Sequence, residues 1–320
     1  MLYRKNYYMD VDFSSLPSCN DGRTTWKKGS FRVRNLDDRF TIVMPNRNMD
    51  AYLAETIESV LDNLRDGDEF FVVDGASTDR SCDIISHYEK RITHWCSEPD
   101  EGLGDALAKG FSWGKNPLQC WINCGDLLLK GALNAAASVL NETSAELIYG
   151  DDFHIDQQGR VMALSSGKVR WFPQMMLYGN WTPLQDACFW RRSLYERVGG
   201  VDSSSGIAAD YDLFLRFALR SKCAHVPIVF SAFRQHDGQM SINRRNEYRR
   251  HVKQLQERER RLLGVGAGQA VIMQHTFTNL HRVRARITWL QKLLPFPEKG
   301  MLASNLQCRF RNADKNAPEQ

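Results

Sequence analysis

From Arg39 onward, short apolar runs alternate with amphipathic stretches, and this alternation limits the fold more than any other feature of the sequence. Runs at 40–44, 69–73, 92–96, 120–123 and 146–149 have the length and composition of buried strands. The stretches between them, 52–64, 78–88, 104–111 and 132–140, are predicted helices. Strands that alternate with helices of about ten residues indicate βαβ units. We therefore expect an α/β fold with a Rossmann-like, mostly parallel sheet flanked by helices.

Length and composition exclude several classes of protein. The chain has 320 residues, 25% of them charged, with 22 Gly and 10 Pro, which is usual for one large or two ordinary globular domains. No apolar run reaches the roughly 18–20 residues that a membrane helix needs. The first twelve residues lack the apolar segment of a signal peptide. We therefore expect a cytoplasmic protein whose eight scattered cysteines are reduced thiols.

Positive charge is concentrated at the C-terminal end. Residues 244–320 hold 16 Lys and Arg against 6 Asp and Glu, whereas residues 1–243 have a net charge of −6. The stretches 244–263 and 280–294 are predicted as basic amphipathic helices, joined by a Gly-rich linker at 264–268. Such helices suit the inner face of a membrane; docking on the body or on a second subunit is the alternative. The predicted organisation is an irregular arm (1–38), a catalytic domain (39–243) and a basic helical extension (244–320).

Polar residues follow each of five predicted strands. They are Pro45-Asn46-Arg47, Asp74-Gly75, Glu98-Pro99-Asp100, Asn123-Cys124-Gly125-Asp126 and Gly150-Asp151-Asp152. In open α/β sheets, ligands bind beyond the carboxyl ends of the strands. We therefore expect these five groups to converge on one ligand site.

Five sequence blocks, taken together and in order, resemble family 2 glycosyltransferases with the GT-A fold. They are Ile-Val-Met-Pro-Asn-Arg-Asn, Val-Val-Asp-Gly-Ala-Ser-Thr-Asp, Glu-Pro-Asp-Glu-Gly-Leu-Gly-Asp-Ala-Leu-Ala-Lys-Gly, Trp-Ile-Asn-Cys-Gly-Asp and Ala-Asp-Tyr-Asp-Leu-Phe-Leu-Arg. The resemblance covers roughly residues 39–240. It implies an inverting transferase that moves a hexose or hexosamine from a nucleotide sugar, a UDP-sugar, to a lipid-linked carbohydrate acceptor. Bacterial enzymes of surface polysaccharide synthesis are similar.

The resemblance also implies roles for individual residues. Asp210 matches the catalytic base, while Asp126 and His236 match ligands of a divalent metal, Mn²⁺ or Mg²⁺. The implied nucleotide-sugar-binding residues are Pro45, Asn46, Arg47, Asp74, Gly75, Asp100, Asp105, Lys109, Asn123 and Gly125. The chemistry is consistent with these roles, because a hard cation neutralises the leaving diphosphate and a carboxylate deprotonates the acceptor hydroxyl.

Each of these assignments has a structural alternative. Asp210 stands where a helix begins, and a helix N-terminus favours acids whatever their function. Asp126 is also placed to cap the apolar stretch that follows it, and Asp74 to close a turn at a strand end. His236 is equally well explained as a loop histidine.

Rival functions remain open because the chain has Gly75, Gly125 and Ala209 where the family often has acids. The main alternative is a GT-A-like partner of another transferase that binds nucleotide or glycan without turnover; the presence of both Asp126 and Asp210 argues against it. A nucleotidyltransferase would need a Gly-rich basic loop after the first strand, and only Arg47 is basic there. The basic tail matches no nucleic-acid-binding module, so we expect no nucleic acid partner.

Overall fold

The computed structural model describes residues 39–169, 172–179, 181–236, 239, 244–292, 301–303, 306 and 308–310. The predicted arm at 1–38 lies outside the described residues. The strands are β1 (Phe40–Asn46), β2 (Glu69–Asp74), β3 (His94–Ser97), β4 (Leu118–Trp121), β5 (Leu127–Leu128), β6 (Leu147–Ile155), β7 (Val161–Ser165), β8 (Cys188–Arg191), β9 (Cys223–Arg234) and β10 (Arg309–Phe310). The helices are α1 (Asp50–Leu61), α2 (Ser81–His87), α3 (Leu103–Trp113), α4 (Ala132–Glu142), α5 (Phe172–Tyr178), α6 (Arg192–Arg197), α7 (Ala209–Arg220), α9 (Arg245–Leu262) and α10 (Ala267–Lys292), with 3₁₀ turns η3 (Gln185–Ala187) and η4 (Ser203–Ala208).

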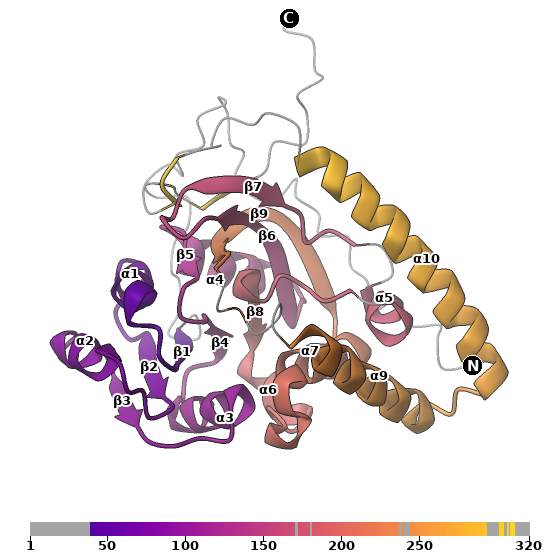
Figure 1. Cartoon of the computed structure of the whole chain (residues 1–320), viewed down its shortest axis with the longest axis horizontal. Helices are drawn as coiled ribbons and strands as arrows, with labels where there is room; N and C mark the ends of the chain where they lie inside the picture. Colours follow the sequence, from indigo (N-terminus) through magenta and orange to yellow (C-terminus); the bar gives the residue numbers. More distant parts are fainter. Residues whose placement is uncertain are drawn as a thin grey trace, which may run out of the picture.

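One sheet connects the strands of the described part, in the order β10-β9-β6-β8-β4-β1-β2-β3 (Figure 1). Strands β3, β2, β1 and β4 pair in parallel, as the alternation of strands and helices predicts. Beyond β4 the sheet is mixed, because β8 lies antiparallel between β4 and β6. Two successive antiparallel pairings return β6 to the direction of β4, so the five strands predicted from sequence all point toward one edge of the sheet.

Two predicted boundaries need correction. The fifth predicted strand continues to Ile155, so Gly150, Asp151 and Asp152 lie inside β6 and do not follow it. Asp151 and Asp152 are buried there, so four strand ends remain that can supply polar loops to a ligand. The second C-terminal helix begins at Ala267 and not at 280.

The first strands are continuous apolar runs because both of their faces are buried in the core. From Phe40 to Met44 every side chain is buried, since helices cover both faces of the sheet. On the other side of β4, the rings of Trp121, Trp190 and Phe214 pack together with centroid distances of 5.3 to 6.2 Å. This aromatic cluster joins β4, β8 and α7, and so fixes the helix that carries Asp210 against the sheet.

Helix α10 runs along the side of the molecule opposite α1 and α2 (Figure 1). Helix α9 buries Val252, Leu255, Gln256 and Glu259 against the body. Helix α10 packs on α5 through Phe277, whose ring stacks on Tyr178 at 6.0 Å. None of the helices in the described part of the chain combines the length and apolar character that crossing a membrane requires. The described cysteines are all free thiols, and Cys19 lies outside the described residues.

Candidate active site

The ends of β1 and β2 are joined through Asp74, which is completely buried. One carboxylate oxygen accepts hydrogen bonds from Asn46 Nδ2 at 2.6 Å and Ser77 Oγ at 2.5 Å, and the other from Ser97 Oγ at 2.6 Å and the backbone N–H of Ser77. Burial alone would raise the pKa of Asp74, but these hydrogen bonds outweigh it and lower the pKa. Because protein groups already occupy both oxygens, the arrangement favours the interpretation of Asp74 as the residue that closes the turn.

Asp100 takes up the space beside Gly75. A Cβ atom at position 75 would lie 2.6 Å from Oδ2 of Asp100, so the glycine is required for this close approach. The other oxygen of Asp100 accepts the backbone N–H of Gly102 at 2.9 Å and lies 4.0 Å from the guanidinium of Arg47, which is mostly exposed. Three of the predicted nucleotide-binding residues, Arg47, Gly75 and Asp100, therefore meet at one point. Pro45 lies close by in the chain, at the end of β1.

Helix α3 links this group to the helix that carries Asp210. At its start, Gly104 lies so close to Ala209 and Ser203 that a Cβ atom would be 3.1 Å from each of them. Asp105 stands in the first turn, where its Oδ2 accepts the backbone N–H of Glu101 at 3.3 Å. Lys109, predicted near the phosphates, forms a 2.6 Å ion pair with Glu98.

The loop after β4 is held in place by its neighbours. Gly125 has φ of +105°, a conformation that strains any other residue, which explains the glycine where the family often has an acid. The backbone N–H of Gly125 donates to Thr56 Oγ1 at 3.0 Å. Asn123 donates to Gln185 Oε1 at 2.6 Å, and Gln185 in turn donates to the backbone oxygen of Trp121 at 2.8 Å. Gln185 is a site residue that the sequence analysis did not identify.

Asp126 lies below this loop next to a second buried acid, Asp186 of η3, and each is 4% exposed. Oδ1 of Asp126 accepts the backbone N–H of Arg234 at 3.0 Å. Burial raises the pKa of Asp126 well above its usual value, and the charge of Asp186 raises it further. Burial also raises the pKa of Asp186, to about 6, and a hydrogen bond with Ser231 only partly opposes this rise. Two such acids cannot both be ionised at low cost unless positive charge is near, and the guanidinium of Arg234 supplies part of that charge, since it lowers the pKa of Asp126.

This pair of acids fits a divalent cation. Hard cations take oxygen ligands, and Mg²⁺ is commonly held by one or two carboxylates together with substrate phosphates. Among the described residues there is no group of three or more His, Cys, Asp or Glu side chains that could hold a metal ion alone. His236 follows β9, and its ring lies 5.4 Å from that of Tyr52. A bound cation would therefore depend on oxygen atoms of the nucleotide.

Arg234 connects the loop that carries Asp126 to α1 and was not identified from the sequence. Its side chain is 1% exposed. The guanidinium donates to the backbone oxygen of Gly125 at 2.8 Å and pairs with Glu55 on α1, and its carbon lies 4.9 Å from the centre of the Tyr52 ring. A lone arginine at the end of an apolar strand gives no sequence signal for a role of this kind.

Asp210 stands in the first turn of α7. Burial raises the pKa of Asp210 to about 6. The hydrogen bond from the backbone N–H of Tyr211, at 2.7 Å, lowers the pKa but does not offset the effect of burial. Asp212, by contrast, is fully buried and bound to Arg216 and Arg258, so it has a structural role. A carboxylate with a pKa near 6 is ionised at neutral pH yet basic enough to take a proton.

Comparison with known proteins identifies the family. Residues 41–199 match the family model for glycosyl transferase family 2. A PGL/p-HBAD biosynthesis glycosyltransferase of Mycobacterium bovis (strain BCG) is 26% identical over 204 residues, which are 59% of this chain and 75% of the relative.

A solved structure shares the fold. The chain is similar to Staphylococcus aureus TarS 1–349 in complex with UDP, with a TM-score of 0.57 and 15% identity over 81% of this chain and 76% of that one. With TarS 1–349 in complex with UDP-GlcNAc the TM-score is 0.49 at 15% identity, and the match spans 63% of this chain but only 60% of that one. The fold is GT-A, and through residues 41–199 the chain belongs to glycosyl transferase family 2 and is a glycosyltransferase.

Proposed function

We propose that this glycosyltransferase moves a hexose or hexosamine from a UDP-sugar to a carbohydrate acceptor, with inversion at the anomeric carbon. The main support is Asp210, a carboxyl group whose pKa is raised to about 6 and whose helix packs against the first turn of α3. That packing joins the predicted base to the loops predicted to bind the donor.

In this proposal Asp210 takes the proton of the acceptor hydroxyl as the oxygen attacks the anomeric carbon. The new C–O bond forms on the face opposite the leaving group, and the bond from the anomeric carbon to the diphosphate oxygen breaks. The nucleotide diphosphate leaves with the electron pair, so one displacement inverts the configuration. General-base assistance of this kind contributes roughly 10²–10⁴-fold.

Asp126 and His236 are the proposed metal ligands, and Asp186 adds a second buried negative charge behind Asp126. A bound Mn²⁺ or Mg²⁺ would supply neutralisation of the charge that develops on the leaving diphosphate. We propose that Asp100 contacts the base of the nucleotide. Its carboxylate occupies the space beside Gly75, where a side chain at position 75 would otherwise lie. Asn46, Arg47, Asp105, Lys109 and Asn123 complete the proposed donor site.

We further propose that the acceptor is lipid-linked and that the C-terminal helices lie on an anionic membrane surface, as in surface polysaccharide synthesis. Val271 and Ile272 on α10 are both about two-thirds exposed, and the region from Arg244 onward has a net charge of +10. Exposed apolar side chains in a segment of net positive charge are typical of helices that bind the membrane interface. Sedimentation with vesicles containing phosphatidylglycerol, compared with neutral vesicles, tests this part. A protein that sediments with neither kind of vesicle, or equally with both, would contradict it.

Calorimetric titration with UDP, GDP and ADP, each with Mn²⁺ and again with EDTA, tests the donor and the metal. Metal-dependent binding of UDP alone supports the proposal and selects UDP-sugars for a turnover screen. Preference for GDP changes the donor but keeps the reaction. If no nucleotide binds, the alternative of a non-catalytic partner replaces the proposed activity.

A further inference from the structure

Helix α9 begins beyond the residues matched by the family model, yet it is attached to the helix that carries the proposed base. Nε2 of Gln256 lies 2.7 Å from the backbone oxygens of Met176 and Gly179 and 2.8 Å from the hydroxyl of Tyr211 on α7. The amide is 1% exposed, so these contacts replace water completely. A buried amide with three oxygen neighbours fixes both the position and the rotation of the helix.

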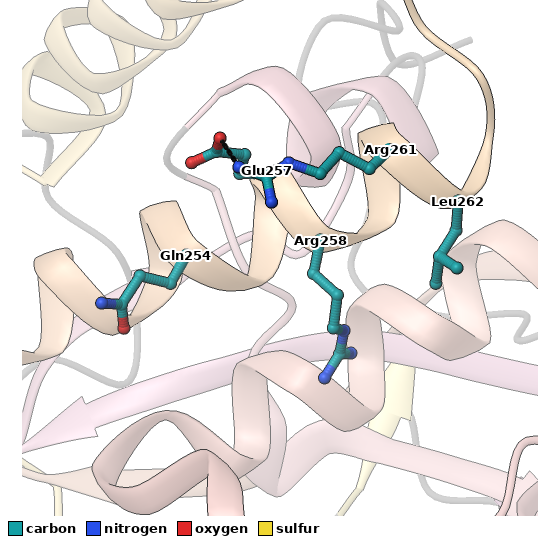
Figure 2. A pocket seen from close by; sticks show the side chains of 5 residues that line it. All are labelled: Gln254, Glu257, Arg258, Arg261 and Leu262. Carbon is teal, nitrogen blue, oxygen red and sulfur yellow. Dashed lines mark hydrogen bonds and ion pairs between the residues drawn. The ribbon is translucent and has the colours of Figure 1, made fainter.

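Charged residues add a second attachment between α9 and α7. Arg258 pairs with Asp212, which is fully buried, and Glu259 pairs with Arg220 at 2.8 Å. Figure 2 shows how Arg258 extends from α9 while Glu257 and Arg261 pair with each other at the helix surface. These residues line a surface hollow of about 490 Å³ together with Gln254 and Leu262. The hollow is lined by α9 itself and contains none of the residues at the strand ends.

The first turns of α9 reach the proposed base. The hydroxyl of Tyr248 lies 3.4 Å from Oδ2 and 3.5 Å from Oδ1 of Asp210. No other described side chain donates a hydrogen bond to this carboxyl group. Tyr211, the next residue of α7, also interacts with this carboxyl group. On α9, the ring of His251 lies against the backbone oxygen of Ser205, and on α3, Asp105 follows Gly104, which packs against Ala209.

We propose that α9 is part of the active site and that Tyr248 is a positioning residue, whose hydroxyl holds the ionised carboxylate of Asp210 in place for proton transfer. The inference rests on the proposed function of Asp210. It assigns the C-terminal extension a role in the reaction in addition to any role at a membrane.

The physical effect has a definite sign. A hydroxyl that donates to a carboxylate stabilises the ionised form, so its removal raises the pKa of the carboxyl group. Burial already raises the pKa of Asp210, and the hydrogen bond from Tyr248 opposes that rise. Loss of the hydroxyl therefore leaves a smaller fraction of Asp210 ionised near pH 6. The hydrogen bonds are long, as they often are before substrate binds.

The experiment is a carboxyl ¹³C NMR titration of the full chain labelled at aspartate, with Asp210→Asn to identify the signal. In Tyr248→Phe we expect the pKa of Asp210 to rise by roughly half to one unit. The acid limb of the turnover profile should move by the same amount, which reduces turnover roughly two- to fivefold at pH 6 and little at pH 8.5. Tyr248→Leu removes the hydroxyl with a different side chain and should shift the pKa in the same direction.

Tyr88→Phe is the matched control, because Tyr88 donates to the carboxylate of Glu58 at 2.7 Å on another part of the surface. It should leave the pKa of Asp210 and the pH profile unchanged. An unchanged pKa in both Tyr248 variants would overturn the inference, as would an equal loss of turnover at every pH. If Asp210→Asn keeps full turnover, the proposed function of Asp210 fails instead, and the NMR titration still reports whether Tyr248 acts on this carboxyl group.

Discussion

The two halves of the domain are built from different kinds of interaction. In the half formed by β1 to β4, polar loops directly follow parallel strands, and neighbouring loops bind one another, as Asn46 and Asp74 do. In the half formed by β6 to α9, buried charged and polar groups join elements far apart in sequence, as Arg234 joins Asp126 and Glu55. The first half is assembled from local signals. The second depends on partners that no local pattern identifies, and it holds the proposed base.

Asp210→Asn is the strongest test of this division, because it should affect the reaction in one half and leave nucleotide binding in the other half intact. Asparagine keeps the shape of the side chain but cannot take a proton, so we expect turnover to fall by roughly 10²–10⁴-fold. Nucleotide affinity should stay nearly unchanged, because the donor loops belong to the other half. In the unaltered protein, turnover should fall as the pH drops below about 6, since protonation removes the base. Measurement of turnover and of UDP affinity across pH 5–9 checks both statements, and unchanged turnover would remove Asp210 as the base.

The second test removes a charge that joins the two halves. Arg234→Met should lower the free energy of unfolding by about 2–4 kcal/mol, because it leaves the backbone oxygens of Gly125 and Gln157 without this donor. Arg80→Met is the control: that arginine is exposed and 3.5 Å from Asp50, a pair expected to contribute less than about 1 kcal/mol. Urea denaturation measures both. Equal effects would mean that Arg234 has no special structural role.

The sequence predicts the first half well, because its signals are local. A buried strand shows as an apolar run, and a turn shows as Asp74-Gly75 at its end. The resemblance to the family also singled out Asp126 and Asp210 as candidates. It could not identify Gln185, Asp186 or Arg234, because their partners lie on distant elements. The antiparallel insertion of β8 is hidden for the same reason, since pairing of strands 70 residues apart leaves no periodic signal.

The third test concerns the attachment of α9. Gln256→Leu keeps the apolar contacts but leaves the backbone oxygen of Gly179 without this donor, whereas the backbone oxygen of Met176 keeps the hydroxyl of Tyr211. We expect a loss of about 1–3 kcal/mol in the free energy of unfolding. Gln254→Leu, on the exposed face of the same helix, should change it by less than about 0.5 kcal/mol. Thermal unfolding compares the two, and a stable Gln256→Leu protein would show that α9 is not attached through this amide.

The smallest expected effect lies in the first half, at Gly75. Gly75→Ala places a Cβ atom 2.6 Å from Oδ2 of Asp100, and the carboxylate has to move while the fold stays intact. If Asp100 binds the nucleotide base, UDP affinity should fall about tenfold, equal to about 1.4 kcal/mol. A double-mutant cycle with Asp100→Ala separates this effect from simple crowding. Once the carboxylate is absent, Gly75→Ala should cost no further affinity. Equal losses in both backgrounds would mean that the methyl group itself obstructs the nucleotide, and Asp100 would lose its proposed role.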